Sequence, residues 1–93
     1  MNREGAHAVQ MNEVERMEVQ LGQKGRMLGF LVVGTDLRPL PAGSTLDRRS
    51  GTFYWQPGPG FRGNYRFIFI GEDEEGKPVK TSLTVTIAPQ IQK

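Results

Sequence analysis

The sequence has no cysteine and only one histidine, His7. Without cysteine there is neither a disulfide framework nor a thiolate metal site, so side-chain packing must supply the stability. A single histidine cannot complete an imidazole metal site, and we expect His7 to be solvated. No serine has a base placed beside it, and Asp36, Asp47 and Asp73 fall on separate expected loops. These absences predict a noncatalytic chain that requires no cofactor.

The sequence also has little excess charge of either sign. Twelve basic and ten acidic residues leave a net charge of only +2, an excess too small to indicate nucleic-acid binding. No apolar run approaches the roughly 18–20 residues that cross a bilayer, and the N-terminus lacks the basic-then-apolar plan of a signal peptide. The sequence therefore predicts no nucleic-acid partner, no membrane insertion and an isolated domain that is monomeric.

Neither end of the chain has a recognisable targeting signal, and we interpret the sequence as a domain cut from a longer polypeptide. Residues 1–10 (MNREGAHAVQ) have little apolar content and predict a disordered leader. Residues 90–93 predict a disordered tail. The folded domain is therefore expected over residues 11–89.

Turn formers are abundant, with twelve glycines and six prolines. Short segments of strand character lie between them, at residues 11–21, 27–33, 44–46, 52–56, 65–70 and 79–87. The first is ambiguous, because Val14, Met17 and Leu21 would also share one face of a helix. We favour a strand, since Gly22 and Gly25 follow at once with a turn.

Two segments carry apolar residues on both faces. The run Met27–Val33 (MLGFLVV) is typical of a strand that is covered on both faces. Residues Tyr65–Ile70 (YRFIFI) place aromatic rings on one face and isoleucines on the other, which predicts a central strand. Six or seven strands with no convincing helix predict an all-β fold, an antiparallel Greek-key sandwich of about seven strands.

The stretch Leu40–Phe69 holds the only tryptophan, both tyrosines and four of the five phenylalanines. By their alternation, we expect five of these rings to form the structural core: Phe53, Trp55, Tyr65, Phe67 and Phe69. The segment Gly63–Phe67 has the form G-x-Y-x-F ahead of a central strand. We expect Tyr65 to form a tyrosine corner, in which the hydroxyl bonds nearby backbone.

Fixed spacings run through this stretch: Leu40-Pro41-Ala42-Gly43, then Asp47, then Gly51-Thr52-Phe53 with Trp55-Gln56-Pro57-Gly58, then Gly63-x-Tyr65-x-Phe67-x-Phe69 and Asp73. This pattern resembles the immunoglobulin-like, cadherin-like modules of large bacterial extracellular and envelope proteins, over roughly residues 11–87. The resemblance implies a seven-stranded immunoglobulin-like sandwich in an exported chain, at the cell surface, outside the cell or in the periplasm. It further implies adhesion, protein interaction or a spacer role, with a protein or neighbouring domains of the same chain as partners.

Cadherin-type modules bind calcium between repeats, and Asp73 matches the acidic residue that follows their long central strand. Glu72, Glu74 and Glu75 surround it with oxygens of the type that Ca²⁺ prefers. The terminal segment APQIQK has no carboxylate, so a complete shell of about six to eight oxygens cannot be drawn from this chain. A solvated acidic loop is the commoner explanation of these carboxylates, and we keep Glu72 and Asp73 as candidate metal ligands beside it.

The alternative function is a carbohydrate-binding or accessory module attached to a secreted enzyme. Consecutive strand residues point to opposite faces, so Phe53, Tyr54 and Trp55 cannot form one stacking platform. Arginines in the central loops offer a second surface for an acidic partner, although interspersed surface charge is the commoner explanation. The candidate interaction residues are Arg48, Arg49, Tyr54, Phe61 and Arg62.

Overall fold

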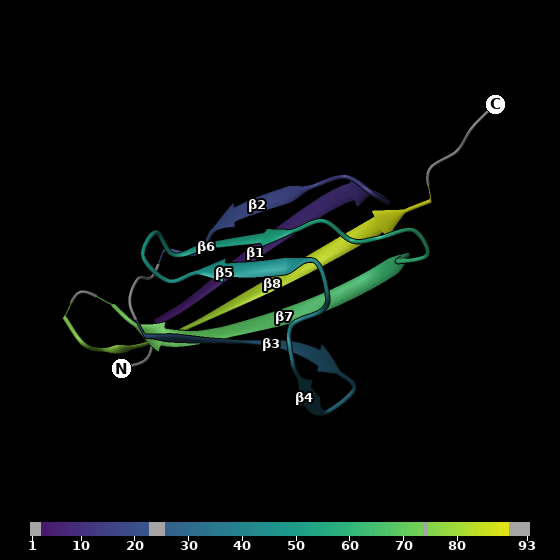
Figure 1. The fold of residues 1–93 in the computed structure, drawn as a ribbon. Coiled ribbons are helices and arrows are strands. Elements are labelled where there is room, and N and C mark those ends of the chain that lie inside the picture. Colours follow the sequence, from purple (N-terminus) through teal and green to yellow (C-terminus); the bar gives the residue numbers. More distant parts are fainter. Residues whose placement is uncertain (1–2, 23–25, 74, 90–93) are drawn as a thin grey trace.

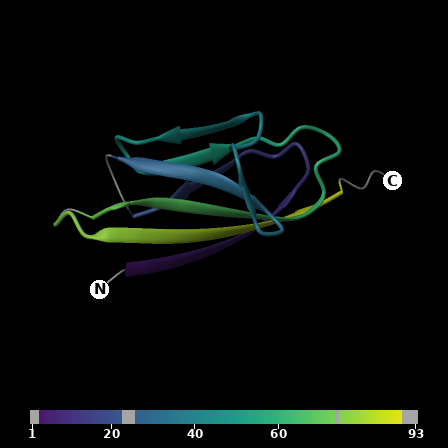
Figure 2. The ribbon, with the colours of Figure 1, turned by 90° about the horizontal axis from the view of Figure 1, so that it is seen from below.

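The computed structural model describes residues 3–22, 26–73 and 75–89. Over these residues the chain is all-β, without a helix, and forms one sheet of five strands and one of three (Figure 1). The strands are β1 (Arg3–Asn12), β2 (Met17–Gln20), β3 (Met27–Val33), β4 (Asp36–Arg38), β5 (Ser44–Asp47), β6 (Thr52–Trp55), β7 (Gly63–Glu72) and β8 (Pro78–Ala88). The two sheets lie face to face, which is compatible with a β-sandwich (Figure 2).

The strand order is β1-β8-β7-β3-β4 in the larger sheet and β2-β6-β5 in the smaller one. Neighbouring strands are antiparallel except for β1 and β8, which run parallel, so the expected purely antiparallel sheet is wrong at this edge. The chain passes between the sheets four times, after β1, β2, β4 and β6. No helix long and apolar enough to cross a membrane occurs among these residues.

The disordered leader predicted for residues 1–10 is wrong where the structure describes it. Residues 3–12 form β1, which pairs with β8 from Arg3 opposite Val79 to Asn12 opposite Ala88. His7 is therefore half-buried in a strand rather than solvated. Alanines flank it and its neighbouring apolar positions are also only half-buried, so the alternation is weak. Residues 1 and 2 and the predicted tail at 90–93 lie outside the described residues.

Strand β4 is a second difference from the sequence prediction, which places no strand between residues 33 and 44. The chain folds back at Gly34, whose φ of 63° suits a tight hairpin turn. Val33 then pairs with Asp36, and Leu31 with Arg38. A strand of three residues is too short to show an alternating pattern, which is why the sequence does not reveal it.

The core lies between the sheets, and both contribute aromatic rings to it. Phe53 of β6 approaches Phe67 and Phe69 of β7, with ring centroids 5.2 and 5.1 Å apart. Around them lie buried side chains from β2, β3 and β8, and alternate residues of β8 point inward. Large rings buried in this way supply most of the hydrophobic stabilisation of a small domain.

Strand β3 has the predicted bounds, but the prediction that it is covered on both faces is wrong. Leu28 is 59% exposed on the outer face of the five-stranded sheet, beside Ile70, which is 43% exposed. Phe30 pairs with Ile68 in the next register position on the same face. No other part of the described chain lies over these residues. The outer face of this sheet is therefore apolar and open where β3 pairs with the second half of β7.

Candidate interaction surface

Four of the five expected core rings are completely buried. Phe53, Trp55, Phe67 and Phe69 have no exposed surface, and the Trp55 indole Nε1 donates a hydrogen bond of 3.2 Å to the carbonyl of Ala42. The indole also meets the Phe67 ring edge-on, with centroids 5.3 Å apart. A ring that is enclosed and hydrogen-bonded in this way has no free face for a ligand.

The LPAG segment of residues 40–43 supports this tryptophan. Gly43 has a φ of 83°, and a Cβ added there would stand 2.8 Å from the backbone oxygen of Gln56. The amide of Gln56 in turn donates to the carbonyl of Gly43 at 3.2 Å. Both the backbone conformation and this close approach require glycine. The spacing from LPAG to Trp55 thus has a structural purpose.

Tyr65 does not form the expected tyrosine corner within the described chain. Its hydroxyl has no hydrogen bond to the residues that the structure describes, and the side chain is half-buried rather than sealed. The ring instead meets Trp55 edge-on at 5.5 Å and lies 5.9 Å from Phe61. The role of Tyr65 is therefore packing at the end of the core.

Asp73, one of the two candidate metal ligands, organises the turn between β7 and β8. Its Oδ1 accepts hydrogen bonds from the amides of Glu75 and Lys77, both at 2.9 Å. Glu72 lies at the end of β7, and Glu74 falls outside the described residues. In residues 3–22, 26–73 and 75–89 no three histidine, cysteine, aspartate or glutamate side chains gather as metal ligands would.

The five candidate interaction residues do not form one surface. Arg48 and Arg49 lie in the turn between β5 and β6, whereas Phe61 and Arg62 lie in the loop between β6 and β7, at the other end of the molecule (Figure 1). Tyr54 lies in β6 itself, where the guanidinium carbon of Arg16 stands 5.0 Å from its ring centroid. The sequence prediction therefore combined residues that the fold separates.

The β6–β7 loop is fixed by internal contacts. Phe61 packs edge-on against Trp55, with centroids 5.6 Å apart, and closes this end of the sandwich. The Nε of Arg62 lies 3.6 Å from Oε2 of Glu13, and the same oxygen accepts a hydrogen bond of 3.1 Å from the amide of Gly60. Glu13 is only 8% exposed, so this contact ties the loop to the corner between β1 and β2.

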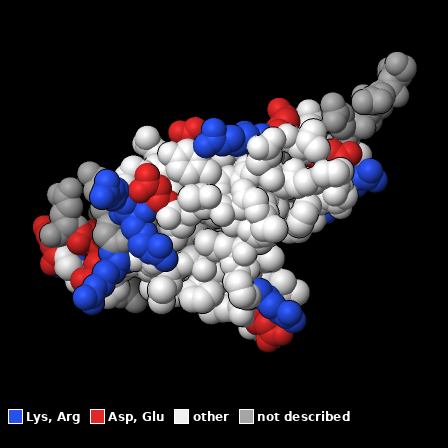
Figure 3. All heavy atoms as spheres, in the orientation of Figure 1, with Lys and Arg blue, Asp and Glu red and all other residues white. Residues whose placement is uncertain are grey.

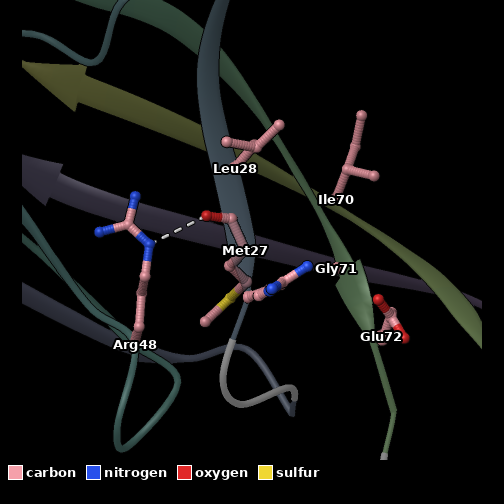
Figure 4. Close-up of a pocket in the computed structure, with 7 residues that line it drawn as sticks. Met27, Leu28, Arg48, Ile70, Gly71 and Glu72 are labelled. Carbon is pink, nitrogen blue, oxygen red and sulfur yellow. Dashed lines mark hydrogen bonds between the residues drawn. The ribbon is translucent and has the colours of Figure 1, made fainter. Parts of the chain in front are cut away.

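The opposite end of the molecule carries an open hollow of about 480 Å³. Its lining includes Arg26, Met27 and Leu28 at the start of β3, Ile70 and Glu72 at the end of β7, and Arg48 of the β5–β6 turn. Figure 4 shows Leu28 and Ile70 side by side, with Arg48 reaching the carbonyl of Met27 from the other side of β3. The hollow thus joins the open apolar face to a fixed cation.

We define the apolar ladder as the large apolar side chains of the outer face, contributed by β3, β4 and β7: Leu28, Phe30, Val32, Leu37, Ile68 and Ile70. Leu28, Leu37 and Ile70 are between 43% and 59% exposed, and the other three are half-buried. Large contiguous apolar patches are a common feature of interaction sites, so the apolar ladder is the candidate interaction surface.

Comparison with known proteins identifies a fold and no family. No family model and no curated protein matches the chain. Among solved structures, the chain is similar to the crystal structure of Listeria monocytogenes InlP, with a TM-score of 0.54 and 16% sequence identity. The match covers 94% of this chain and 27% of the InlP chain. At this level of identity the likeness concerns the fold alone.

Sequence reasoning selected Arg48 as an interaction residue and Glu72 as a metal ligand, and missed the other residues around the hollow. A signal was present, because Leu28 and Phe30 on one segment and Ile68 and Ile70 on another supply a second apolar face. We interpreted that face as covered, as is usual for such runs. Only the register of β3 against β7 shows that the four side chains share one open surface.

Proposed function

We propose that the chain is a noncatalytic, immunoglobulin-like β-sandwich module of a longer exported or cell-surface protein, and that it acts in protein interaction. The observation that carries this proposal is the contrast between the two sides of the five-stranded sheet. On the inner side Phe67 and Phe69 are fully buried, whereas on the outer side Leu28 and Ile70 are open to solvent. An apolar sheet face without cover is suited to another protein surface.

The strand order supports the immunoglobulin-like type. If β2, β5 and β6 are taken as strands B, D and E of that fold, the smaller sheet has the order B-E-D. Strands β8, β7, β3 and β4 then correspond to G, F, C and C′, in the same sequence as in variable-type domains. Strand β1 adds a parallel edge beside G. This correspondence also supports a Greek-key connection between the sheets.

The lining of the hollow supports a noncatalytic role. Its ionisable groups are the guanidinium groups of Arg26 and Arg48 and the carboxylate of Glu72. Neither an arginine nor a lone carboxylate beside two cations is an activated nucleophile. The described lining residues include no hydroxyl, thiol or imidazole. This composition is suited to recognition of charge and shape.

The carbohydrate-binding alternative has weaker support. Trp55 is enclosed, and Tyr54, which is only half-buried, has the Arg16 guanidinium over its ring at 5.0 Å. A cation in that position is attracted to the ring face and occupies the place that a sugar ring would take. The arrangement favours a protein partner over a glycan.

A selection from a phage-displayed random peptide library tests the proposal. We expect peptides to be enriched on the folded chain and to shift the amide NMR signals of β3 and β7. Leu37→Glu combined with Ile70→Glu, at two exposed positions, is expected to abolish this binding. Glu18→Lys, at an exposed position on the other sheet, is the matched control and is expected to have no effect. Failure to enrich any peptide, or shifts confined to other surfaces, would refute an interaction role.

A further inference from the structure

We propose that the hollow at the start of β3 binds an acidic peptide segment of a partner protein, with a carboxylate on Arg48 and an apolar side chain against Leu28 and Ile70. This inference rests on the proposed function and specifies the ligand and the residues that hold it. Three features of the hollow lead to it: an oriented guanidinium, an exposed apolar floor and an excess of unpaired cations.

The guanidinium of Arg48 is held in place by a backbone contact. Its Nε donates a hydrogen bond of 3.0 Å to the carbonyl of Met27, across the gap between the two sheets (Figure 4). No other hydrogen bond or ion pair joins Arg48 to the described residues, so both terminal nitrogens are available. A guanidinium fixed through Nε keeps hydrogen-bond donors for a carboxylate and loses little side-chain entropy on binding.

The floor of the hollow is apolar and exposed. Leu28 and Ile70 face each other across the β3–β7 pair and are 59% and 43% exposed. An isobutyl-sized side chain placed between them would remove apolar surface from water on both strands. Phe30 and Ile68 continue the same face along the strands, which gives an extended segment room for a second apolar contact.

The charged side chains that line the hollow form no ion pair within the described chain. In the described residues, ion pairs join Arg38 to Asp36, Arg62 to Glu13 and Lys77 to Glu75, and none includes a residue that lines the hollow. Glu72 is the one carboxylate in the described lining. Against it, the same lining holds two cations without an ion pair, Arg26 and Arg48.

Figure 3 shows blue basic spheres gathered at this end of the molecule, with some acidic residues among them. The excess of cations selects an acidic partner and argues against a second copy of this chain. A symmetric dimer through the same patch would place these cations opposite one another, at a cost in repulsion.

The test uses three synthetic peptides with blocked termini. The first alternates glutamate with leucine, the second replaces each glutamate with lysine, and the third replaces each leucine with serine. Binding is followed by titration calorimetry and by amide NMR shifts of β3 and β7. We expect the first peptide to bind, and its affinity to fall as salt is added. The other two peptides are expected to bind at least about tenfold more weakly.

Variants of the chain locate the binding. Arg48→Ala is expected to lower the affinity for the glutamate–leucine peptide by about tenfold, the loss typical of one charge-assisted pair. Arg38→Ala is the matched control, because Arg38 is exposed on β4 and lines no part of the hollow, and it is expected to have no effect. Leu28→Glu, at an exposed position, introduces repulsion without disturbing the core and is expected to abolish binding even if Arg48→Ala proves unstable.

Several results would overturn the inference. Equal binding of the lysine peptide, or unchanged binding by both Leu28→Glu and Arg48→Ala, would exclude an acidic ligand at this site. Self-association of the chain in sedimentation, lost in Leu28→Glu, would assign the surface to a second copy. If the random library yields peptides that bind the apolar ladder outside the hollow, the interaction role survives and this inference fails. If no peptide binds at all, both fail.

Discussion

Val14 has the least favourable backbone conformation among the described non-glycine residues, with a φ of 64°. It is the third residue of the turn between β1 and β2, which is closed by a 3.3 Å hydrogen bond from the amide of Glu15 to the carbonyl of Asn12. A turn that needs positive φ at this place usually has glycine or asparagine there. A β-branched residue in this conformation is strained by about 1–3 kcal/mol.

Replacement of Val14 by asparagine should therefore stabilise the protein. The side chain is 40% exposed, so little packing is lost, and asparagine tolerates the left-handed region. We expect the free energy of unfolding to rise by about 1 kcal/mol in urea denaturation. Val14→Ala, which keeps a Cβ and much of the strain, is the control and should gain less. A destabilised asparagine variant would show that valine makes a contact worth more than its strain.

Tyr65 and Trp55 should respond very differently to substitution. Because the Tyr65 hydroxyl has no bond to the described residues, Tyr65→Phe should change the stability by less than about 0.5 kcal/mol. Trp55→Ala leaves a cavity in the centre of the core and should cost about 3–5 kcal/mol. Thermal melting of both variants checks this pair. A loss of 1–2 kcal/mol in Tyr65→Phe, the size of a buried hydrogen bond, would restore the tyrosine corner.

At the scale of elements, the sequence predicts strands where one face is well buried and alternation is strong. Strand β8 has this character, with Leu83, Val85 and Ile87 inward and threonines between them. Strand β1 does not, because Val9 and its inward neighbours are only half-buried. Strand β4 is too short for any pattern. The turn at residues 47–51 was predictable because its stabilising contact is local. The Asp47 side chain accepts a hydrogen bond of 3.0 Å from the amide of Arg49, two residues along the chain.

Deletion of residues 1–12 tests whether this segment is a strand of the sheet or a disordered leader. The structure pairs β1 with β8 over ten register positions, so removal would leave the backbone of β8 unpaired along one side. We expect the truncated chain to melt at least several degrees lower and to aggregate more readily. A truncated chain with an unchanged melting temperature would show that β1 contributes nothing, as a disordered segment would.

At the scale of the whole molecule, the residues of the proposed site come from three places in the sequence. The open face was not predictable, because apolar residues on both faces of a strand indicate cover without saying whether the same chain supplies it. Arg48 carried a visible charge, but its contact with Met27 depends on the meeting of two sheets. Local pattern therefore predicts the layers and the core, while the register and the packing of the sheets assemble the surface.

A sealed aromatic core confines the function of this protein to its outer surface. Trp55 is the only tryptophan, which makes intrinsic fluorescence a direct measurement of its surroundings. For the folded chain we predict emission at shorter wavelength than free tryptophan and strong protection from acrylamide, both lost on unfolding. Emission like that of free tryptophan, with ready quenching while the fold is intact, would contradict the account.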